Sequence, residues 1–333
     1  MLETTTVGSF PKSEELQKAR TQARRGQLDR ARLLELERAA TRDWILIQEK
    51  IGLDILVDGE QYRGDMATYF AENLGGFTIS SRVRSYGNRY YRKPIATGAI
   101  RWTGPITVDW FRFAQGLTRK PVKGMLTGPY TMMDWSFDEY YANRRAFCLD
   151  LARAIQEEVK ALEAAGAQFI QIDEPAVSTR VEELDLAIEA MRIVTQGVRV
   201  KTGTHICYGD FERAYPKMLD LAVDQFDLEF TNSNFKLLEV IAKVPFTKEV
   251  AFGVVDVHSH RIESVEEIVS AIRKALVVFP PEKLTIDPDC GLKTRLKEES
   301  IGKLTNMVAA VRQVKKELGV PTTSVGAPGT PSR

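Results

Sequence analysis

Short apolar runs alternate with longer amphipathic stretches along most of this 333-residue chain. This alternation is typical of successive parallel βα units. In one amphipathic stretch, residues 143–165, apolar positions recur at helical spacing, and Gly166 follows as an expected helix stop. The apolar runs predict eight strands, at residues 5–8, 54–57, 122–128, 167–172, 197–204, 226–230, 249–257 and 283–287.

Nearly every residue able to do chemistry falls at or just past the end of a predicted strand. These residues are Ser9, Glu60, Asp173, His205, Cys207, Glu229, His258 and Cys290. In a (βα)8 barrel the carboxyl ends of all strands meet on one face, where active sites lie. A doubly wound open sheet is the alternative, but it gathers such residues at one switch point. We therefore predict an α/β fold, a (βα)8 TIM barrel, with residues 1–320 as one catalytic domain.

Two segments depart from the βα pattern. Residues 61–119 form a long insertion after the second predicted strand, and within it residues 81–94 alternate Arg and Tyr around a central Gly-Asn, which predicts a hairpin. A solvated hairpin is the default. Contact with RNA is an alternative that the balanced charge argues against, and contact with a phosphate group or another protein near the barrel mouth is a further alternative. Residues 321–333 are rich in Pro, Gly, Ser and Thr, so we expect a disordered tail.

The composition of the chain limits the kinds of partner that the protein is expected to bind. Hydrophobic residues make up 44% of the chain and charged residues 27%, and the net charge of +1 gives no general reason to bind nucleic acid or an anionic membrane. No apolar run could span a bilayer, and the N-terminal residues lack the features of a secretory signal. The cysteines number only three, which argues for a reducing compartment. We expect a cytoplasmic protein without nucleic-acid or membrane partners.

The pair His205-x-Cys207 is the sharpest local signal. Residues two apart on an extended segment point to the same side, so imidazole and thiolate can reach one ion. Cys290 could add a second thiolate and Glu229 a carboxylate, which makes a ligand set suited to zinc. Two thiolates and one carboxylate give the zinc site a net negative charge, which suits it better to holding an external thiolate than to splitting water. Inert buried cysteines, as expected for Cys148, and a purely structural zinc ion are the alternatives.

Glu60 and Asp173 end two different predicted strands. Paired carboxylates at a barrel mouth can do acid–base chemistry or bind an ammonium group. Carboxylates at loop starts are also common on protein surfaces, so the sequence leaves a solvated role open for each.

A resemblance to a known family adds to this interpretation. The matching segments run in family order at residues 7–11, 58–60, 122–129, 135–137, 172–176, 204–208, 256–259 and 288–293. They resemble the C-terminal catalytic half of cobalamin-independent methionine synthase, a TIM barrel that methylates homocysteine. The resemblance implies zinc bound by His205, Cys207, Glu229 and Cys290.

The same resemblance implies a binding site for homocysteine. Glu60 and Asp173 would hold its ammonium group, and the segment Val7, Gly8 and Ser9 would hold its carboxylate. It also implies an active-site histidine at His258 and a contact of Trp135 with the methyl donor. His260 has no counterpart that we can name, and we expect it on the surface.

The expected methyl donor follows from two departures. Residues 177–179 lack the acidic residue that usually contacts the pterin in folate-dependent relatives, and the chain begins where their second barrel begins. In both respects it resembles the short core methionine synthases. We therefore expect methylcobalamin, or a methylated corrinoid carrier protein, to supply the methyl group.

Three alternatives stay open at this point. One is a homocysteine methyltransferase that depends on methyltetrahydrofolate. Another is a corrinoid-dependent methyltransferase for a different thiol such as coenzyme M, although that thiol has no ammonium for Glu60 and Asp173 to bind. The last is a zinc-binding protein without catalytic activity.

Overall fold

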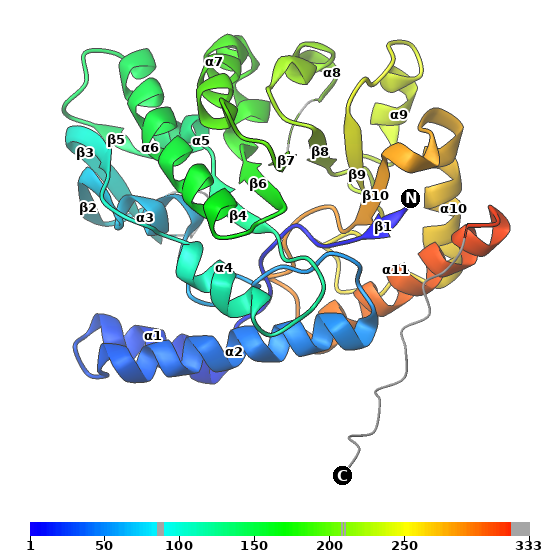
Figure 1. The fold of residues 1–333 in the computed structure, drawn as a ribbon, viewed down its shortest axis with the longest axis horizontal. Coiled ribbons are helices and arrows are strands. Elements are labelled where there is room, and N and C mark those ends of the chain that lie inside the picture. The colour runs from blue at the N-terminus through cyan, green and yellow to red at the C-terminus, as the bar shows by residue number, and fades with distance from the viewer. Residues whose placement is uncertain (85–89, 208, 210, 321–333) are drawn as a thin grey trace.

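The computed structural model describes residues 1–84, 90–207, 209 and 211–320. Its main sheet has seven parallel strands that curl around one another (Figure 1). In spatial order they are β1 (Glu3–Thr4), β10 (Leu284–Asp287), β9 (Glu249–Gly253), β8 (Gln225–Leu228), β7 (Lys201–Ile206), β6 (Phe169–Asp173) and β4 (Gly124–Thr127). Apart from β1, these strands are almost wholly buried, which is why the sequence shows them as continuous apolar runs.

Residues 54–57 close the sheet into a barrel. Leu56 forms a parallel bridge with Val122, and its backbone N–H donates to Pro121 O at 2.9 Å. On the other side Ile55 N–H donates to Thr4 O at 3.0 Å, beside β1. This segment therefore joins the two edges of the seven-stranded sheet and takes the place of the eighth barrel strand, or stave. The predicted TIM barrel is confirmed.

Helices cover the outside of the barrel, as Figure 1 shows. The long ones are α1 (Glu14–Arg24), α2 (Arg30–Ile51), α6 (Arg144–Ala164), α7 (Leu184–Thr195), α10 (Val265–Val278) and α11 (Lys297–Glu317). Local sequence sets their ends: Asp29 accepts a hydrogen bond from Arg32 N at the start of α2, and Gly52 ends that helix with φ +96°. Short helical turns fill the loops, namely α8 (Phe211–Ala214), α9 (Lys236–Ile241), η3 (Lys217–Asp220) and η4 (Pro281–Lys283).

The predicted insertion builds a small second sheet. It contains α3 (Met66–Ala71), β2 (Leu74–Arg84), β3 (Tyr90–Trp102) and α4 (Val108–Gln115). Strands β2 and β3 pair antiparallel as the predicted hairpin, and β5 (Phe137–Asp138) joins β3 in parallel. Residues 85–89 at the predicted turn lie outside the described residues. Glu158 of α6 anchors the insertion, because its buried carboxylate accepts hydrogen bonds from Trp102 Nε1 and from the backbone of Ile106 and Thr107.

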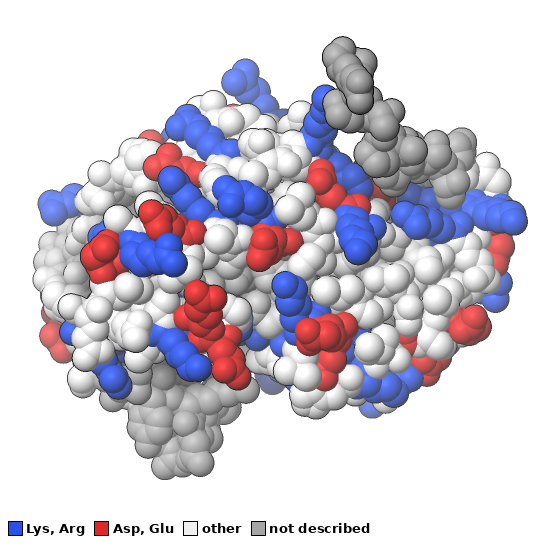
Figure 2. Space-filling view, turned by 90° about the horizontal axis from the view of Figure 1, so that it is seen from below, with Lys and Arg blue, Asp and Glu red and all other residues white. Residues whose placement is uncertain are grey.

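The surface carries both signs of charge close together. In Figure 2, which views the molecule from below Figure 1, Lys and Arg side chains are interspersed with Asp and Glu. Ion pairs such as Arg32–Glu35 and Arg273–Glu317 contribute to this mixture. Within the described ranges, no helix is both long enough and apolar enough to cross a membrane. The predicted disorder of residues 321–333 concerns a segment outside the described part of the chain.

Candidate functional site

The strand ends bring three potential metal ligands together. His205 lies near the end of β7, Cys207 follows that strand, and Cys290 lies in the loop after β10. One ligand atom from each residue lies within 4.8 Å of the others. His205 and Cys207 are buried and Cys290 is partly exposed, so the cluster opens toward solvent on one side. The structure thus gathers three of the four predicted ligands.

Asp227 of β8 orients the histidine. Its Oδ1 lies 2.8 Å from His205 Nδ1, and both side chains are buried. Burial opposes protonation of His205, but Asp227 and the two cysteine sulfurs outweigh it and raise the histidine pKa. Among the described residues, His205 Nε2 has no hydrogen-bond partner of acceptable geometry. A carboxylate on one ring nitrogen and a buried open position on the other is the usual arrangement of a metal-binding histidine.

The two thiols form an unequal pair. A hydrogen bond from Cys207 lowers the pKa of Cys290 well below its usual range. The same hydrogen bond, together with burial, raises the pKa of Cys207. The two thiols therefore differ in how readily they ionise, and a cation that joins the cluster would favour the thiolate form of both. The donor set of one imidazole and two sulfurs fits zinc.

Glu229 is not one of the three members of this cluster, but the loop that it begins contacts the Cys290 loop. It is the first residue after β8 and is buried. Asp289 fixes its loop, because Asp289 Oδ1 accepts hydrogen bonds from Phe230 N and Thr231 N at 3.0 Å each. Since Asp289 precedes Cys290 directly, it joins the Glu229 loop to the Cys290 loop. Zinc ligation by Glu229 stays a prediction.

The predicted ammonium-binding carboxylates follow two strand positions of the barrel that are separated by β4. Asp173 ends β6 and is buried, whereas Glu60 follows the stave at residues 54–57 and is partly exposed. Burial raises the pKa of Asp173 to about 7, and the charge of Glu60 adds to that shift. Glu60 has a positive φ of 54°, which its neighbours maintain: its N–H donates to Asp58 Oδ1, and Lys12 Nζ donates to its carbonyl oxygen.

The segment Val7, Gly8 and Ser9 connects this carboxylate pair with the cysteine cluster. A Cβ at Gly8 would lie 2.9 Å from Glu60 Oε1, so the absence of a side chain lets the carboxylate approach the backbone. On the other side, a Cβ at Gly291 would lie 2.1 Å from Ser9 Oγ, and Leu292 N–H donates to Ser9 O at 2.8 Å. The residues that are predicted to bind the ammonium and carboxylate groups of the substrate are therefore continuous with the loop that carries Cys290.

Three further predicted residues lie outside this cluster. His258 is exposed on the loop after β9, where its backbone N–H donates to Asp256 Oδ1 at 2.7 Å. Buried Lys303 holds that loop by donating to Asp256 O at 2.8 Å. His260 is exposed with Nδ1 2.8 Å from Glu299 Oε1, in agreement with the surface position expected for it. The catalytic role of His258 stays a prediction.

Trp135 is half-buried at the end of α5 (Pro129–Asp134), the short helix that follows β4. Glu174 fixes the start of this helix, since its buried carboxylate accepts hydrogen bonds from Tyr130 N and Thr131 N. The neighbours Asp173 and Glu174 thus have different surroundings, one beside the predicted substrate contacts and one under a helix. The turns η1 (Pro175–Thr179) and η2 (Val181–Glu183) follow. Contact of Trp135 with a methyl donor stays a prediction.

Four buried polar residues of the site escaped the sequence analysis: Lys123, Gln171, Asp227 and Asp287. Lys123 Nζ donates to Gln171 Oε1 at 2.5 Å. Burial lowers the pKa of Lys123, although the carboxylates of Asp227 and Asp287 oppose that shift. All four lie within or next to apolar strand runs, and a charged or amide side chain inside such a run was the available signal.

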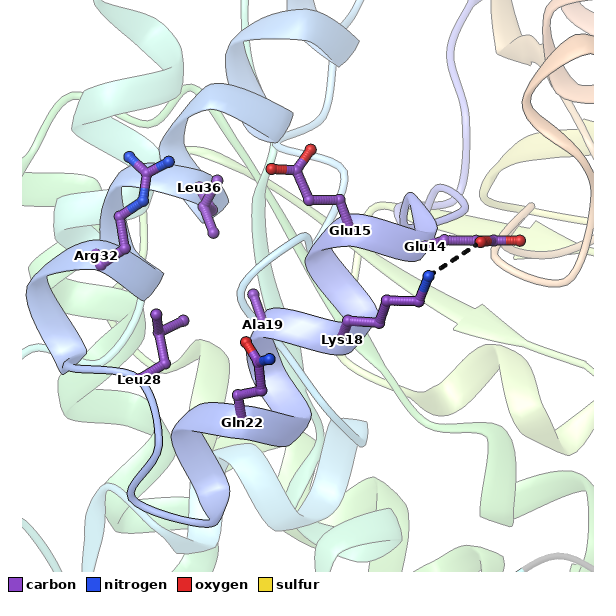
Figure 3. Close-up of a pocket in the computed structure, with 8 residues that line it drawn as sticks. All are labelled: Glu14, Glu15, Lys18, Ala19, Gln22, Leu28, Arg32 and Leu36. Atoms are coloured by element: carbon purple, nitrogen blue, oxygen red, sulfur yellow. Dashed lines mark ion pairs between the residues drawn. The ribbon is translucent and has the colours of Figure 1, made fainter.

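A surface hollow lies elsewhere, between α1 and α2 (Figure 3). Its volume is about 500 Å³, and its lining includes Glu14, Lys18 and Arg32. Glu14 and Lys18 form an ion pair of 3.5 Å across one turn of α1. None of the predicted site residues lines this hollow, so it plays no part in the site described above.

Comparison with known proteins decides the family. Residues 2–313 match the family described as the catalytic domain of the cobalamin-independent synthase. The chain belongs to this family. It is 40% identical over 319 residues to a methionine synthase of Saccharolobus solfataricus, and the match covers 96% of each protein. The expected resemblance to a short synthase and the expectation of an enzyme are both confirmed.

Longer relatives and a solved structure agree with this assignment. The chain is 41% identical to a 5-methyltetrahydropteroyltriglutamate–homocysteine methyltransferase of Bacillus velezensis, of which it spans 43%. A B12-independent methionine synthase from Shewanella sp. W3-18-1, solved in complex with selenomethionine, superposes with a TM-score of 0.84. That structure is 30% identical, and the match covers 96% of this chain and 99% of the other.

The expected methyl donor was wrong. The family is cobalamin-independent, so methylcobalamin, a methylated corrinoid and a corrinoid carrier protein are not supported. The expectation rested on chain length and on one missing carboxylate at residues 177–179. There Thr179 Oγ1 donates to Ala176 O within η1. One missing contact to a donor does not determine which donor binds.

Proposed function

We propose that this enzyme transfers the methyl group of a 5-methyltetrahydropteroyl donor to the sulfur of L-homocysteine and so produces methionine, with zinc as its metal. The observation that carries the proposal is the continuity of the site. The His205, Cys207 and Cys290 cluster adjoins the Ser9 segment through Gly291, and that segment adjoins Glu60 through Gly8. A thiol-binding end and an ammonium-binding end are thus joined at one barrel mouth.

The cluster suits a metal that binds a thiol. His205 Nε2, Cys207 and Cys290 would hold zinc, and Glu229 is the candidate fourth ligand, since an oxygen ligand yields most readily to an incoming sulfur. When bound, zinc supplies positive charge that favours the thiolate form of a thiol at neutral pH. Asp227 keeps His205 in the tautomer that leaves Nε2 open, because it accepts the hydrogen on Nδ1.

The other residues hold the amino-acid part of homocysteine. Asp173 and Glu60 bind its ammonium group, and the segment from Val7 to Ser9 receives its carboxylate. With both groups fixed, the sulfur is directed to the cysteine end of the site, and such positioning lowers the barrier to transfer.

The reaction forms a sulfur–methyl bond and breaks the bond between the methyl group and a pterin nitrogen. The electron pair of the broken bond stays on that nitrogen, which must take up a proton in order to leave. We assign this proton to His258, an exposed histidine on a loop that Lys303 holds in place.

One assay tests the proposal. Zinc-loaded protein is incubated with L-homocysteine and with 5-methyltetrahydrofolate in monoglutamyl or triglutamyl form, and methionine is quantified. We expect turnover that Cys207→Ser abolishes. Cys148→Ala is the matched control, because Cys148 is buried in α6 away from the cluster and its loss should preserve turnover. No methionine from either donor, with folded and zinc-loaded protein, would overturn the proposal.

A further inference from the structure

We propose that Lys123 and Gln171 act as a positioning pair that sets the spacing between the two ends of the amino-acid site. The inference rests on the proposed function, in which Asp173 binds the ammonium group of homocysteine and the Val7 segment receives its carboxylate. Neither Lys123 nor Gln171 contacts substrate in this scheme. Both act through the groups to which they are hydrogen-bonded.

Gln171 joins the two ends directly. Its Nε2 donates to Val7 O at 2.9 Å and to Asp173 Oδ1 at 2.8 Å. An amide nitrogen has two hydrogens, so these two contacts use its whole donor capacity. Val7 and Asp173 lie 166 positions apart: Val7 follows β1 and Asp173 ends β6, and these two strands are not neighbours in the barrel. One side chain therefore fixes the position of two groups that the backbone does not pair.

Lys123 fixes the orientation of that amide. Its Nζ donates to Gln171 Oε1 at 2.5 Å, and it has a hydrogen for this bond whether or not it is protonated. A reversed amide would turn its oxygen toward two acceptors, Val7 O and Asp173 Oδ1, and its NH2 group toward the donor Lys123. Lys123 is 2% exposed and Gln171 is 1% exposed, so water does not replace either partner.

The arrangement has a consequence for specificity. Because Gln171 occupies Oδ1 of Asp173, the second oxygen is the one presented to an ammonium group. The same amide holds the Val7 carbonyl, which belongs to the segment that receives the carboxylate. The pair should therefore favour a thiol that carries both groups of an α-amino acid over a thiol that carries only the carboxylate. 4-Mercaptobutanoate differs from homocysteine only by lacking the amino group.

Two variants and one matched control test the pair. Gln171→Leu removes the two donated hydrogen bonds together with the one accepted from Lys123. Gln171→Glu keeps the size of the side chain but places an oxygen against Val7 O and Asp173. The control is Gln225→Leu, which removes another buried barrel glutamine, whose Nε2 donates to Thr285 Oγ1. For each protein the KM for homocysteine, the KM for the methyl donor, zinc per chain and thermal stability are measured.

We expect the KM for homocysteine to rise about 30-fold or more in both Gln171 variants, which is the lower end of the range for losing one neutral hydrogen bond and one to a charged group. Zinc content and the KM for the donor should match wild type. The preference for homocysteine over 4-mercaptobutanoate, measured as the ratio of kcat/KM values, should fall by a similar factor. Gln225→Leu should leave that ratio unchanged, whatever its effect on stability.

The outcomes separate this inference from the proposed function. If wild type makes methionine but both Gln171 variants keep its KM and its thiol preference, the positioning role is wrong and the proposed function stands. A loss of stability with an unchanged preference contradicts the role equally, because it shows a structural contribution alone. If wild type makes no methionine, the proposed function fails, and calorimetric titration of homocysteine into wild type and Gln171→Glu decides on the pair. Should Gln171→Leu not fold, Gln171→Glu and Lys123→Arg carry the same comparison.

Discussion

Replacing Asp227 by Asn tests whether His205 binds zinc through Nε2. In the wild-type protein Asp227 Oδ1 lies 2.8 Å from His205 Nδ1, and both residues are buried, so water cannot supply a substitute. A carboxylate can only accept, which keeps the ring hydrogen on Nδ1. The amide of an asparagine can also donate, and an amide that donates to Nδ1 would move the ring hydrogen to Nε2, where it blocks a metal ion.

The size of the effect follows from the hydrogen bond that changes. A bond to a charged group contributes about 1.5–3 kcal/mol and a neutral bond about 0.5–1.5 kcal/mol. Their difference is about 1–1.5 kcal/mol, which at about 1.4 kcal/mol per factor of ten weakens zinc binding roughly 5- to 15-fold. The added cost of the wrong tautomer brings the expected loss into the range of about 10- to 100-fold seen when such partners of metal-binding histidines are removed.

The measurement is a competition for zinc between the protein and a chromophoric chelator at pH 7.5. Asp224→Asn is the matched control, because it removes the same charge just before β8, where Asp224 accepts a hydrogen bond from Thr202 N at 2.8 Å. We expect wild-type affinity in the control. An Asp227→Asn protein that folds and binds zinc as tightly as wild type would refute the assignment of Nε2 as the ligand atom.

Three further predictions follow from the site. Cys207→Ser or Cys290→Ser should reduce the zinc content from about one ion per chain to a small fraction, because thiolate ligands dominate the cluster. Zinc is measured by metal analysis after dialysis, and full metal content in both variants would show that the cluster is not the zinc site. Asp173→Asn should retain zinc and raise the KM for homocysteine about tenfold or more, as an ionic contact with the ammonium becomes neutral, and a saturation curve equal to that of wild type would exclude the ammonium role. Because burial raises the pKa of Asp173 to about 7, its carboxylate is protonated below that pH, so the wild-type KM for homocysteine should rise as pH falls from 8 to 6. The KM of Asp173→Asn should stay flat over that range, with zinc content checked at each pH, and an equal slope in both proteins would assign the titration to another group.

Much of the fold could be predicted from the chain itself. Each buried stave is a short apolar run bounded by polar or turn residues, and the helices between them follow local rules such as the Asp29 cap and the Gly52 stop of α2. The order of the staves then follows from the short, right-handed connections that parallel strands require. The antiparallel pairing of β2 with β3 could be predicted for the same reason, because the alternation in residues 81–94 is a local pattern.

The predicted site was only partly determined in this way. His205 and Cys207 are two residues apart on an extended segment, so their common direction is a local property. Cys290 could be placed beside them once a barrel was assumed. The methyl donor could not be predicted from residues 177–179, because the identity of a bound molecule depends on all surfaces around it and not on one missing carboxylate.

What only the tertiary structure decided is the polar network beneath the site. Gln171 lies on β6, Asp227 lies on β8 and Lys123 directly precedes β4. Each lies in or next to an apolar run in which the sequence indicates only burial. Their partners come from distant segments: the Gln171 amide contacts Val7, and Asp227 contacts His205. The register between strands decides which buried polar groups meet, and that register depends on the packing of the whole barrel. The sequence by itself therefore determined the staves and the His-x-Cys pair, which rest on local periodicity, whereas contacts across strands determined how those residues are oriented.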